Sequence, residues 1–127
     1  MSEWLMSQGV EIEAGLLSVE DARKFIASRI RDKCRRVLIE PLDHDPNEAL
    51  CHAAEMEKIV LSAGVTIEQV HHGYDIACWA VNRRAIYRGH GIRTGLEDIA
   101  VLPNGLAAEN NEQLVRTAVS MINGDTR

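Results

Sequence analysis

The stretch RVLIEPLDHDPNEALCHAAEMEKIVLSAGVTIEQVHHG, residues 36–73, decides the fold. Residues 36–41 and 66–72 are short, apolar runs with β-branched side chains, which is typical of buried strands. Residues 45–64 begin with an aspartate and a proline, place apolar side chains three and four positions apart, and end at Gly64, which indicates one long helix. A strand, a helix and a second strand at these separations form a parallel β-α-β unit.

The rest of the chain repeats this alternation. Two further strands are predicted, over residues 9–13 and 91–97. Three further helices are predicted, over residues 18–30, 74–89 and 111–122. The order is therefore β-α-β-α-β-α-β-loop-α, which predicts a parallel α/β fold.

The composition fits a globular protein and excludes several classes. Residues 1–127 are 46% hydrophobic and 26% charged, as expected of a single domain. The 19 acidic side chains outnumber the 14 Lys and Arg residues, and no basic cluster is interleaved with aromatic residues, so no nucleic-acid partner is expected. No apolar run is long enough to cross a membrane, and the first residues do not resemble a signal peptide, so we expect a cytoplasmic protein without a membrane anchor.

Polar side chains occur at the point where each predicted strand ends. They are Glu13 in the first strand, Glu40 and Asp43 around the end of the second, His71 and His72 in the third, and Glu97 with Asp98 in the fourth. The carboxyl ends of parallel strands meet at one edge of the sheet, where the loops carry the active site in such folds. We therefore expect a functional site built from these side chains.

Each of these residues also has a simpler interpretation. Glu13 follows a valine and an isoleucine and precedes Ala-Gly-Leu-Leu, so we expect a partly desolvated carboxylate that needs a partner or a metal, with a solvated loop residue as the alternative. Only one histidine of the pair can face the interior, since neighbouring strand residues point to opposite faces. His72 is the better candidate, and a hydrogen-bonded structural histidine is the alternative. His52 and His90 are interpreted as helix-surface and loop residues.

The segment GIRTGLEDIAVLPNG, residues 91–105, gathers three charged side chains. Arg93 can pair with Asp98, orient it and lower its pKa, which leaves Glu97 to a cation or a hydroxyl group. A plain loop salt bridge is the alternative. No HxH or HExxH motif occurs in the chain, so spacing alone cannot build a complete zinc site.

These residues resemble a known family. GIRTGLEDIAVLPNGLAAENNEQLVRTAV is similar to the C-terminal signature of the β-keto acid cleavage enzymes, the group that includes 3-keto-5-aminohexanoate cleavage enzyme. That signature has an R-x-G-[LF]-E-D segment, a P-x-G turn and an N-x-x-L-V helix. GVEIEAGLLSVEDARKF, RVLIEPLDHDPNEAL and HHGYDIACWAVNRRAIYRG look like successive strand-helix units of the same family, so the resemblance covers nearly the whole chain.

The resemblance implies a zinc-dependent TIM (β/α)8 barrel that exchanges acyl groups between a β-keto acid and acetyl-CoA, giving acetoacetate and a new CoA thioester. Matched to the motif, Glu97 is the zinc ligand, Asp98 is the catalytic acid or base, and Arg93 is the group that orients and tunes it. Glu13 corresponds to a substrate-contacting glutamate at the end of the fifth barrel strand. The three arginines of the third predicted helix, Arg83, Arg84 and Arg88, are interpreted as a solvated helix face rather than as coenzyme A contacts.

The chain departs from the family in two ways. A full barrel has eight strand-helix units in about 250 residues, whereas about four units are predicted here, which correspond to strands 5 to 8 of a partial TIM barrel. The family's two zinc-binding histidines form an HxH motif on the second barrel strand, and this chain has no counterpart. Half a barrel leaves the inner face of its sheet exposed, and we expect an apolar surface there that must be covered.

Two functions from different classes follow from these expectations. The first is a C-terminal fragment of a zinc-dependent acyltransferase, inactive alone, which pairs with a missing N-terminal half or forms a homo-oligomer. Whether the chain itself is an enzyme is left open by the lack of the HxH ligands. The second is a non-catalytic α/β half-barrel interaction module that binds a partner with its open face.

Overall fold

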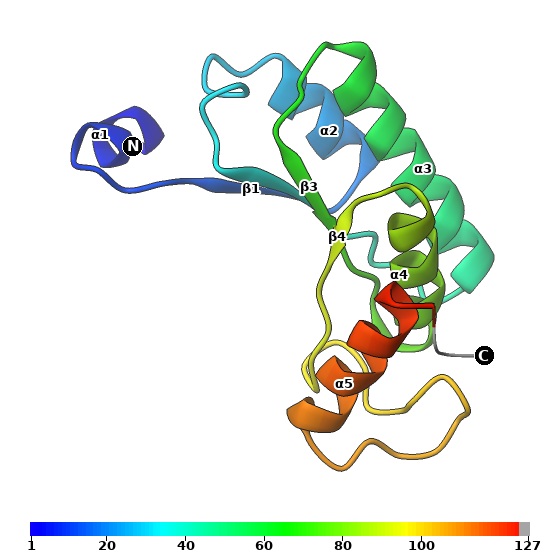
Figure 1. Ribbon diagram of the computed structural model, residues 1–127. Helices are drawn as coiled ribbons and strands as arrows, with labels where there is room; N and C mark the ends of the chain where they lie inside the picture. Colours follow the sequence, from blue (N-terminus) through cyan, green and yellow to red (C-terminus); the bar gives the residue numbers. More distant parts are fainter. Residues whose placement is uncertain (125–127) are drawn as a thin grey trace.

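The computed structural model describes residues 1–124, in which four parallel strands alternate with helices (Figure 1). The strands are β1 (Glu13–Leu16), β2 (Arg36–Ile39), β3 (Glu68–His71) and β4 (Gly91–Ile92), and they lie in the order β1-β2-β3-β4. The helices are α1 (Ser2–Ser7), α2 (Val19–Ile26), α3 (Pro46–Ser62), α4 (Cys78–Tyr87) and α5 (Asn111–Ile122), with the 3-10 turn η1 (Asp75–Ala77) before α4. The predicted parallel α/β class is confirmed.

Local sequence signals explain the ends of the helices. Ser18 and Asp45 cap α2 and α3, each through a side-chain oxygen that accepts a hydrogen bond from a backbone N–H of the first turn. Asn110 caps α5 in the same way. Gly64 follows α3 with a φ of 79°, a left-handed conformation that glycine adopts at little cost.

The first strand begins later in the chain than predicted. Gly9 has a φ of 82° and turns the chain after α1, and the ladder with β2 begins at the pair Glu13 and Arg36. The sequence Ala-Gly-Leu within β1 has no β-branched side chain and therefore gives no strand signal. Glu13 thus lies at the amino end of the sheet, and its predicted place at the carboxyl end is wrong.

The fourth strand is shorter than predicted. Its ladder with β3 covers only two residue pairs. The carbonyl of Gly95 then accepts hydrogen bonds from the backbone N–H groups of Asp98 and Ile99, at 2.9 and 3.1 Å, which closes a turn. Glu97 and Asp98 therefore lie on a turn after the strand rather than at its end.

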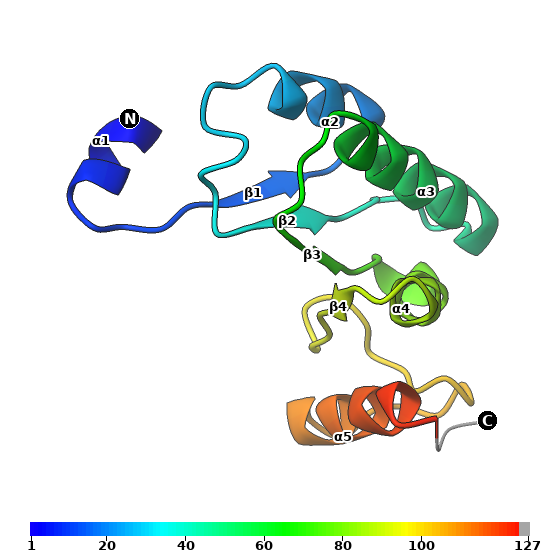
Figure 2. The same cartoon turned by 45° about the horizontal axis from the view of Figure 1, so that its top comes forward.

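One face of the sheet packs against helices and the other face is open. Figure 2 shows α2, α3 and α4 on the same side of the strands, with α1 set apart beyond β1. The core on the helix side contains Val37 and Ile39 of β2 together with Met56 of α3. A second core around Trp79 and Leu114 joins α4 to α5. Side chains at the carboxyl end of the open face are therefore free to form a site.

The open face is more polar than predicted. Val37 and Ile39 point to the helices, so Leu38 between them faces away. Leu38 and its register partner Val70 are only 9% and 8% exposed. The expected apolar surface is therefore wrong, because charged side chains flank this short apolar row at both ends of the sheet.

At the amino end of the open face, Glu13, Arg36 and Glu68 form a shared ion pair, which we call the amino-end row. Nε of Arg36 lies 3.7 Å from a carboxylate oxygen of Glu13 and 3.2 Å from one of Glu68. Two carboxylates thus share one guanidinium group, so this row carries a net negative charge.

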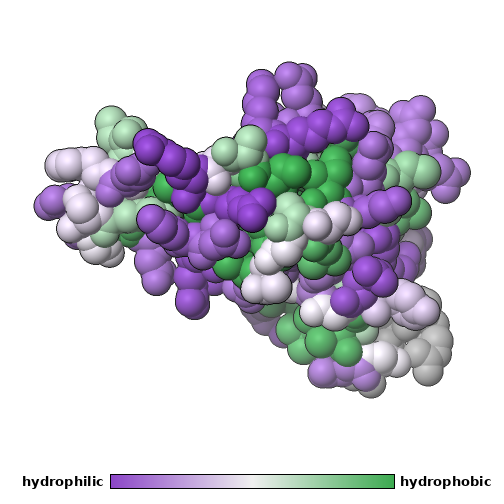
Figure 3. Space-filling view, turned by 90° about the horizontal axis from the view of Figure 1, so that it is seen from above, coloured by the Kyte–Doolittle hydropathy of each residue, from purple (hydrophilic) through white to green (hydrophobic). Residues whose placement is uncertain are grey.

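The outer surface is mainly hydrophilic on the side seen in Figure 3. Hydrophilic side chains surround a smaller apolar area there, and the end that carries α1 projects at the left. None of the helices within residues 1–124 is long and apolar enough to cross a membrane.

Gly73 links β3 to η1 in a place where no side chain fits. A Cβ there would lie 2.9 Å from both the carbonyl oxygen of Ala77 and the Cα of Cys78. These backbone atoms cannot move without displacing the start of α4, so we expect Gly73→Ala to lower the free energy of unfolding by about 1–3 kcal/mol in urea titrations. Gly15→Ala is the matched control, because its Cβ would meet only the flexible side chain of Glu40 at 3.6 Å. Equal midpoints for the two variants would contradict this prediction.

Candidate functional site

Four charged or polar side chains meet at the carboxyl edge of the sheet. Nε2 of His72 donates a hydrogen bond to Oε1 of Glu40 at 2.7 Å, and Nδ1 of the same ring lies 3.7 Å from Oδ2 of Asp98. Nη1 of Arg93 lies 3.8 Å from the same oxygen of Glu40. The side chains of Glu40, His72 and Asp98 are largely buried, whereas that of Arg93 is 47% exposed. We call these four residues the edge site.

The strand ladder places three members of the edge site. Glu40, His72 and Arg93 each come directly after a strand, and each donates its backbone N–H to a carbonyl of the neighbouring strand, at 2.9, 3.0 and 3.2 Å. Asp98 comes from the turn after β4, and its carbonyl accepts the backbone N–H of Asp75 at 2.6 Å. Asp75 makes this bond in a left-handed conformation, with a φ of 51°, which costs energy in a residue with a side chain.

A small cavity lies inside the edge site. Its volume is about 40 Å³, and its lining includes Glu40, His72, Gly73 and Asp98. Nδ1 of His72 is buried and has no hydrogen-bond partner within the described part of the chain. A water molecule or a small polar group fits a cavity of this size. A group that enters between His72 and Asp98 can therefore bond to both.

The surroundings of Asp98 suit acid–base chemistry. Burial raises the pKa of Asp98, the positive charges of His72 and Arg93 lower it, and the neighbouring carboxylates of Glu97 and Glu40 raise it again. The net direction is upward. A carboxyl group whose pKa is raised holds its proton more readily than an ordinary aspartate, which favours a role in acid–base chemistry.

Arg93 and Glu97 differ from the sequence-based expectation. The ion pair of Arg93 is with Glu40, so the predicted contact pair with Asp98 is wrong. Arg93 does act to lower the pKa of Asp98, as predicted, but burial outweighs this effect and the net direction is upward. Glu97 is exposed on the turn and makes no hydrogen bond or ion pair within residues 1–124.

Glu13 lies outside the edge site. It is at the opposite end of the sheet, its side chain is 47% exposed, and it pairs with Arg36. The ion pair provides the partner that the sequence predicts for Glu13, on a half-exposed side chain, and a contact between Glu13 and substrate stays an untested prediction. Asp43 also takes another partner, since its carboxylate accepts a hydrogen bond from Nδ1 of His52 in α3 at 2.8 Å.

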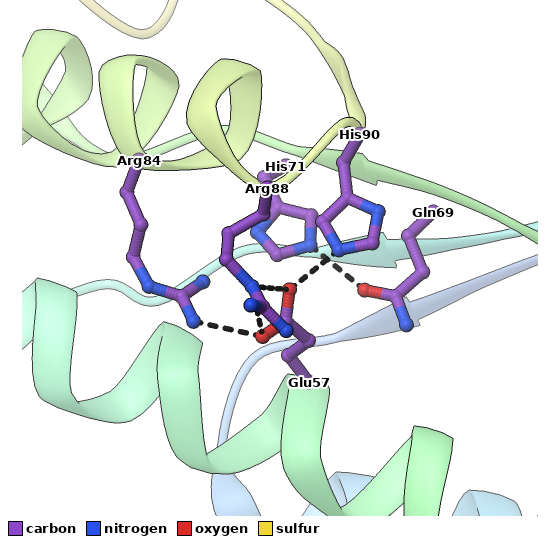
Figure 4. A network of polar contacts seen from close by, with 6 residues as sticks. All are labelled: Glu57, Gln69, His71, Arg84, Arg88 and His90. Carbon is purple, nitrogen blue, oxygen red and sulfur yellow. Dashed lines mark hydrogen bonds and ion pairs between the residues drawn. The ribbon is translucent and has the colours of Figure 1, made fainter.

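A second polar cluster lies on the helix side of the sheet (Figure 4). Glu57 of α3 is 3% exposed, and its Oε1 accepts hydrogen bonds from Nη2 of Arg84 at 2.8 Å and Nε of Arg88 at 3.2 Å. Its Oε2 lies 2.5 Å from Nε2 of His90. The imidazole of His90 stacks on that of His71, with ring centroids 4.7 Å apart. We call these five residues the Glu57 network.

The geometry of the Glu57 network could hold a metal ion, but its charge balance argues against one. Glu57, His71 and His90 offer ligand atoms within 4.8 Å of one another, the one group of this kind in the described part of the chain. Arg84 and Arg88 already compensate the single carboxylate. A divalent cation would add further positive charge to a buried place where that charge is costly. We interpret the network as structural.

Sequence reasoning missed the Glu57 network. His90 is predicted as a loop residue, and Arg84 and Arg88 as a solvated helix face, but all three donate to one buried carboxylate. A signal was available, because Glu57 lies on the face of α3 that is otherwise apolar. The buried residues of α3 are Ala49, Ala53, Met56, Glu57 and Val60.

The Glu57 network makes stability depend on pH. Burial lowers the pKa of His71 to about 3, and the charge of His90 acts in the same direction. Burial alone would raise the pKa of Glu57, but hydrogen bonds from Arg84, His90 and Arg88 outweigh it and lower the pKa to about 2. Both values lie below those of an unfolded chain, about 6.5 for histidine and about 4.3 for glutamate. The unfolded state therefore binds protons first on acidification, and stability decreases as pH falls.

We expect His71 to account for most of this loss between about pH 6 and pH 4.5, with a slope approaching 1.4 kcal/mol per pH unit. Glu57 adds to the loss below about pH 5, where an unfolded glutamate begins to bind protons. Urea unfolding at several pH values should show a shallower slope for His71→Asn, which removes the titrating ring, than for the unchanged chain. The control is His44→Asn, at an exposed imidazole. A His71→Asn slope as steep as that of the control would contradict the prediction.

Comparison with known proteins assigns the chain to a family. The family model described as beta-keto acid cleavage enzyme, BKACE, matches residues 43–126, more than half of the chain. The matched range includes His72, Arg93, Glu97 and Asp98. No curated protein matches the chain. The resemblance seen in the R-x-G-L-E-D segment is thus confirmed, and the chain belongs to the beta-keto acid cleavage enzyme family.

Proposed function

We propose that this chain carries the proton-transfer part of a β-keto acid cleavage site. The observation that supports this is the small cavity lined by Glu40, His72 and Asp98, with Arg93 paired to Glu40, in a member of that family. The reaction is an acyl exchange between a β-keto acid and acetyl-CoA, giving acetoacetate and a CoA thioester. A proton must move as the carbon–carbon bond is made and broken, and a positioned carboxyl group can move it.

The residues of the edge site have distinct parts in this proposal. Asp98 is the catalytic acid or base, because it lines the cavity and its pKa is raised by burial. Glu40 holds the ring of His72 through Nε2, which turns Nδ1 toward Asp98 and the cavity. Arg93 supplies a positive charge beside Glu40, and its exposed guanidinium can also attract the carboxylate of a β-keto acid.

The described residues 1–124 do not complete the zinc site that the family implies. The proposed ligand Glu97 stands exposed on its turn. Within residues 1–124, the one group of three potential ligands is Glu57, His71 and His90, on the other side of the sheet and already compensated by arginines. A catalytic zinc site normally has three protein ligands. We therefore propose that the other ligands come from outside the described residues.

The open face supports pairing with a complementary half. The structure has four parallel strands with helices on one side. We propose that they are strands 5 to 8 of a TIM barrel, which four further units would close. Two copies that closed one barrel together would bring their amino-end rows to the same end of it, and in each row Glu13 and Glu68 share only Arg36. Like charges in apposition disfavour an interface, so we propose an N-terminal half as the partner rather than a second copy.

An acyl-exchange assay tests the proposed function. The chain alone, given a β-keto acid, acetyl-CoA and zinc, should release no acetoacetate, because its zinc site is incomplete. Coexpression with an N-terminal half of a full-length family member should restore turnover. Asp98→Asn should then reduce kcat by about 10²–10⁴-fold, the usual contribution of a general acid or base. Arg93→Ala should abolish turnover as well.

Two results would contradict this account. Zinc-dependent turnover by the chain alone would refute the incomplete site. Stable pairing with the N-terminal half that restores no turnover would favour the non-catalytic interaction module instead. Glu112→Gln is the matched control for the Asp98 variant, because Glu112 is exposed and pairs only with Arg116 on the same helix.

A further inference from the structure

The edge site and the Glu57 network lie back to back on the same two strands. His71 ends β3 and stacks on His90 at the helix side, while His72, the next residue, points to the open face and the edge site. On the neighbouring strand, His90 directly precedes β4, and Arg93 directly follows it. In the edge site, His72 is thus one position from His71 of the Glu57 network, and Arg93 is three positions from His90.

The backbone alone holds β4 weakly. The strand has two residues, it is the last strand of the sheet, and only two residue pairs join it to β3. The backbone N–H of Arg93 adds one bond to the carbonyl of His71, at 3.2 Å. Because this ladder is so short, the position of β4 depends strongly on the contacts of the side chains at its two ends.

His90 provides a side-chain anchor at the start of β4. Its ring is mostly buried between the carboxylate of Glu57 and the ring of His71, and the two imidazole planes are within 11° of parallel. Figure 4 shows the two rings side by side above the carboxylate, with both arginine side chains entering from α4.

The two oxygens of Glu57 serve different partners. Oε1 accepts the guanidinium groups of Arg84 and Arg88 and so joins α3 to α4. Oε2 lies against His90, and Arg88 also contacts it at 3.3 Å. The contact with His90 instead joins α3 to the residue directly before β4, a link that the two arginines do not make.

We infer that Glu57 is a positioning residue for the edge site. Through His90, and through the ring of His71 stacked on it, Glu57 fixes β4 against β3 and thereby places Arg93 and His72 at Glu40. That this placement matters for catalysis rests on the proposed function. The placement itself is tested without any turnover.

His90→Ala is the first variant to test. It removes the link to β4 but leaves Glu57 paired with both arginines, so the helices keep their contact. In the full chain labelled with ¹⁵N, the imidazole nitrogens of His72 and the Nε–H of Arg93 are followed by NMR. We expect both sets of signals to shift, with loss of the hydrogen-bonded Nε2–H signal of His72. The control His44→Ala should leave both unchanged.

Two further variants distinguish a role of Glu57 in placing His72 and Arg93 from a role only in the stability of the fold. His90→Gln keeps an N–H donor for Glu57 and should return the Arg93 signal toward that of the unchanged chain. Arg88→Gln removes a half-exposed partner of Glu57 and should shift the same signals by less; it decides the question if His90→Ala does not fold.

One pattern overturns the inference. If the variants remain folded by circular dichroism, unfold at lower temperature, and yet show the His72 and Arg93 signals of the unchanged chain, Glu57 only stabilises the fold. That result would leave the proposed function standing. Absence of turnover in the reconstituted assay would refute the proposed function but would not change the NMR result. The two experiments therefore test the proposed function and the positioning role of Glu57 separately.

Discussion

Parallel pairing of β2, β3 and β4 is the constraint on which the rest of this structure depends. It brings the three strand ends to one edge, so that Glu40, His72 and Arg93 each lie one position beyond the ladder. His72 and Arg93 then both contact Oε1 of Glu40. The alternation of side chains along β3 then sends His71 and His72 to opposite faces. The same backbone therefore supports a polar site on the open face and a polar network on the helix face.

The two polar groups differ in how their charges are compensated. In the Glu57 network, one carboxylate has three cationic or donor partners, and its pKa falls to about 2. In the edge site, Asp98 is buried near two other carboxylates, its pKa is raised, and a nitrogen of His72 lacks a partner beside a cavity. A fully compensated carboxylate holds a fold together, whereas an incompletely compensated one is available for proton transfer. This contrast is why we propose proton transfer for the edge site and a supporting, non-catalytic role for the Glu57 network.

Patterns within short windows could be predicted, and contacts between elements could not. The caps at Ser18 and Asp45 and the α/β alternation follow from local chemistry. The β1 register could not be predicted, because Ala-Gly-Leu has no intrinsic strand preference and pairs only where β2 provides a ladder. His72 was recognisable as a site candidate from its place beside Gly73. The partners of Glu57 were not, since they join residues far apart in the chain.

The family match covers the motif that contains Arg93, Glu97 and Asp98, but a motif is not a complete site. Within residues 1–124, no group of potential metal ligands includes Glu97, so we propose that these residues form no zinc site around Glu97 by themselves. Native mass spectrometry of the purified chain, with and without added zinc, tests it most directly. We expect a chain that retains no stoichiometric zinc. One zinc ion per chain that disappears in Glu97→Gln would contradict the account.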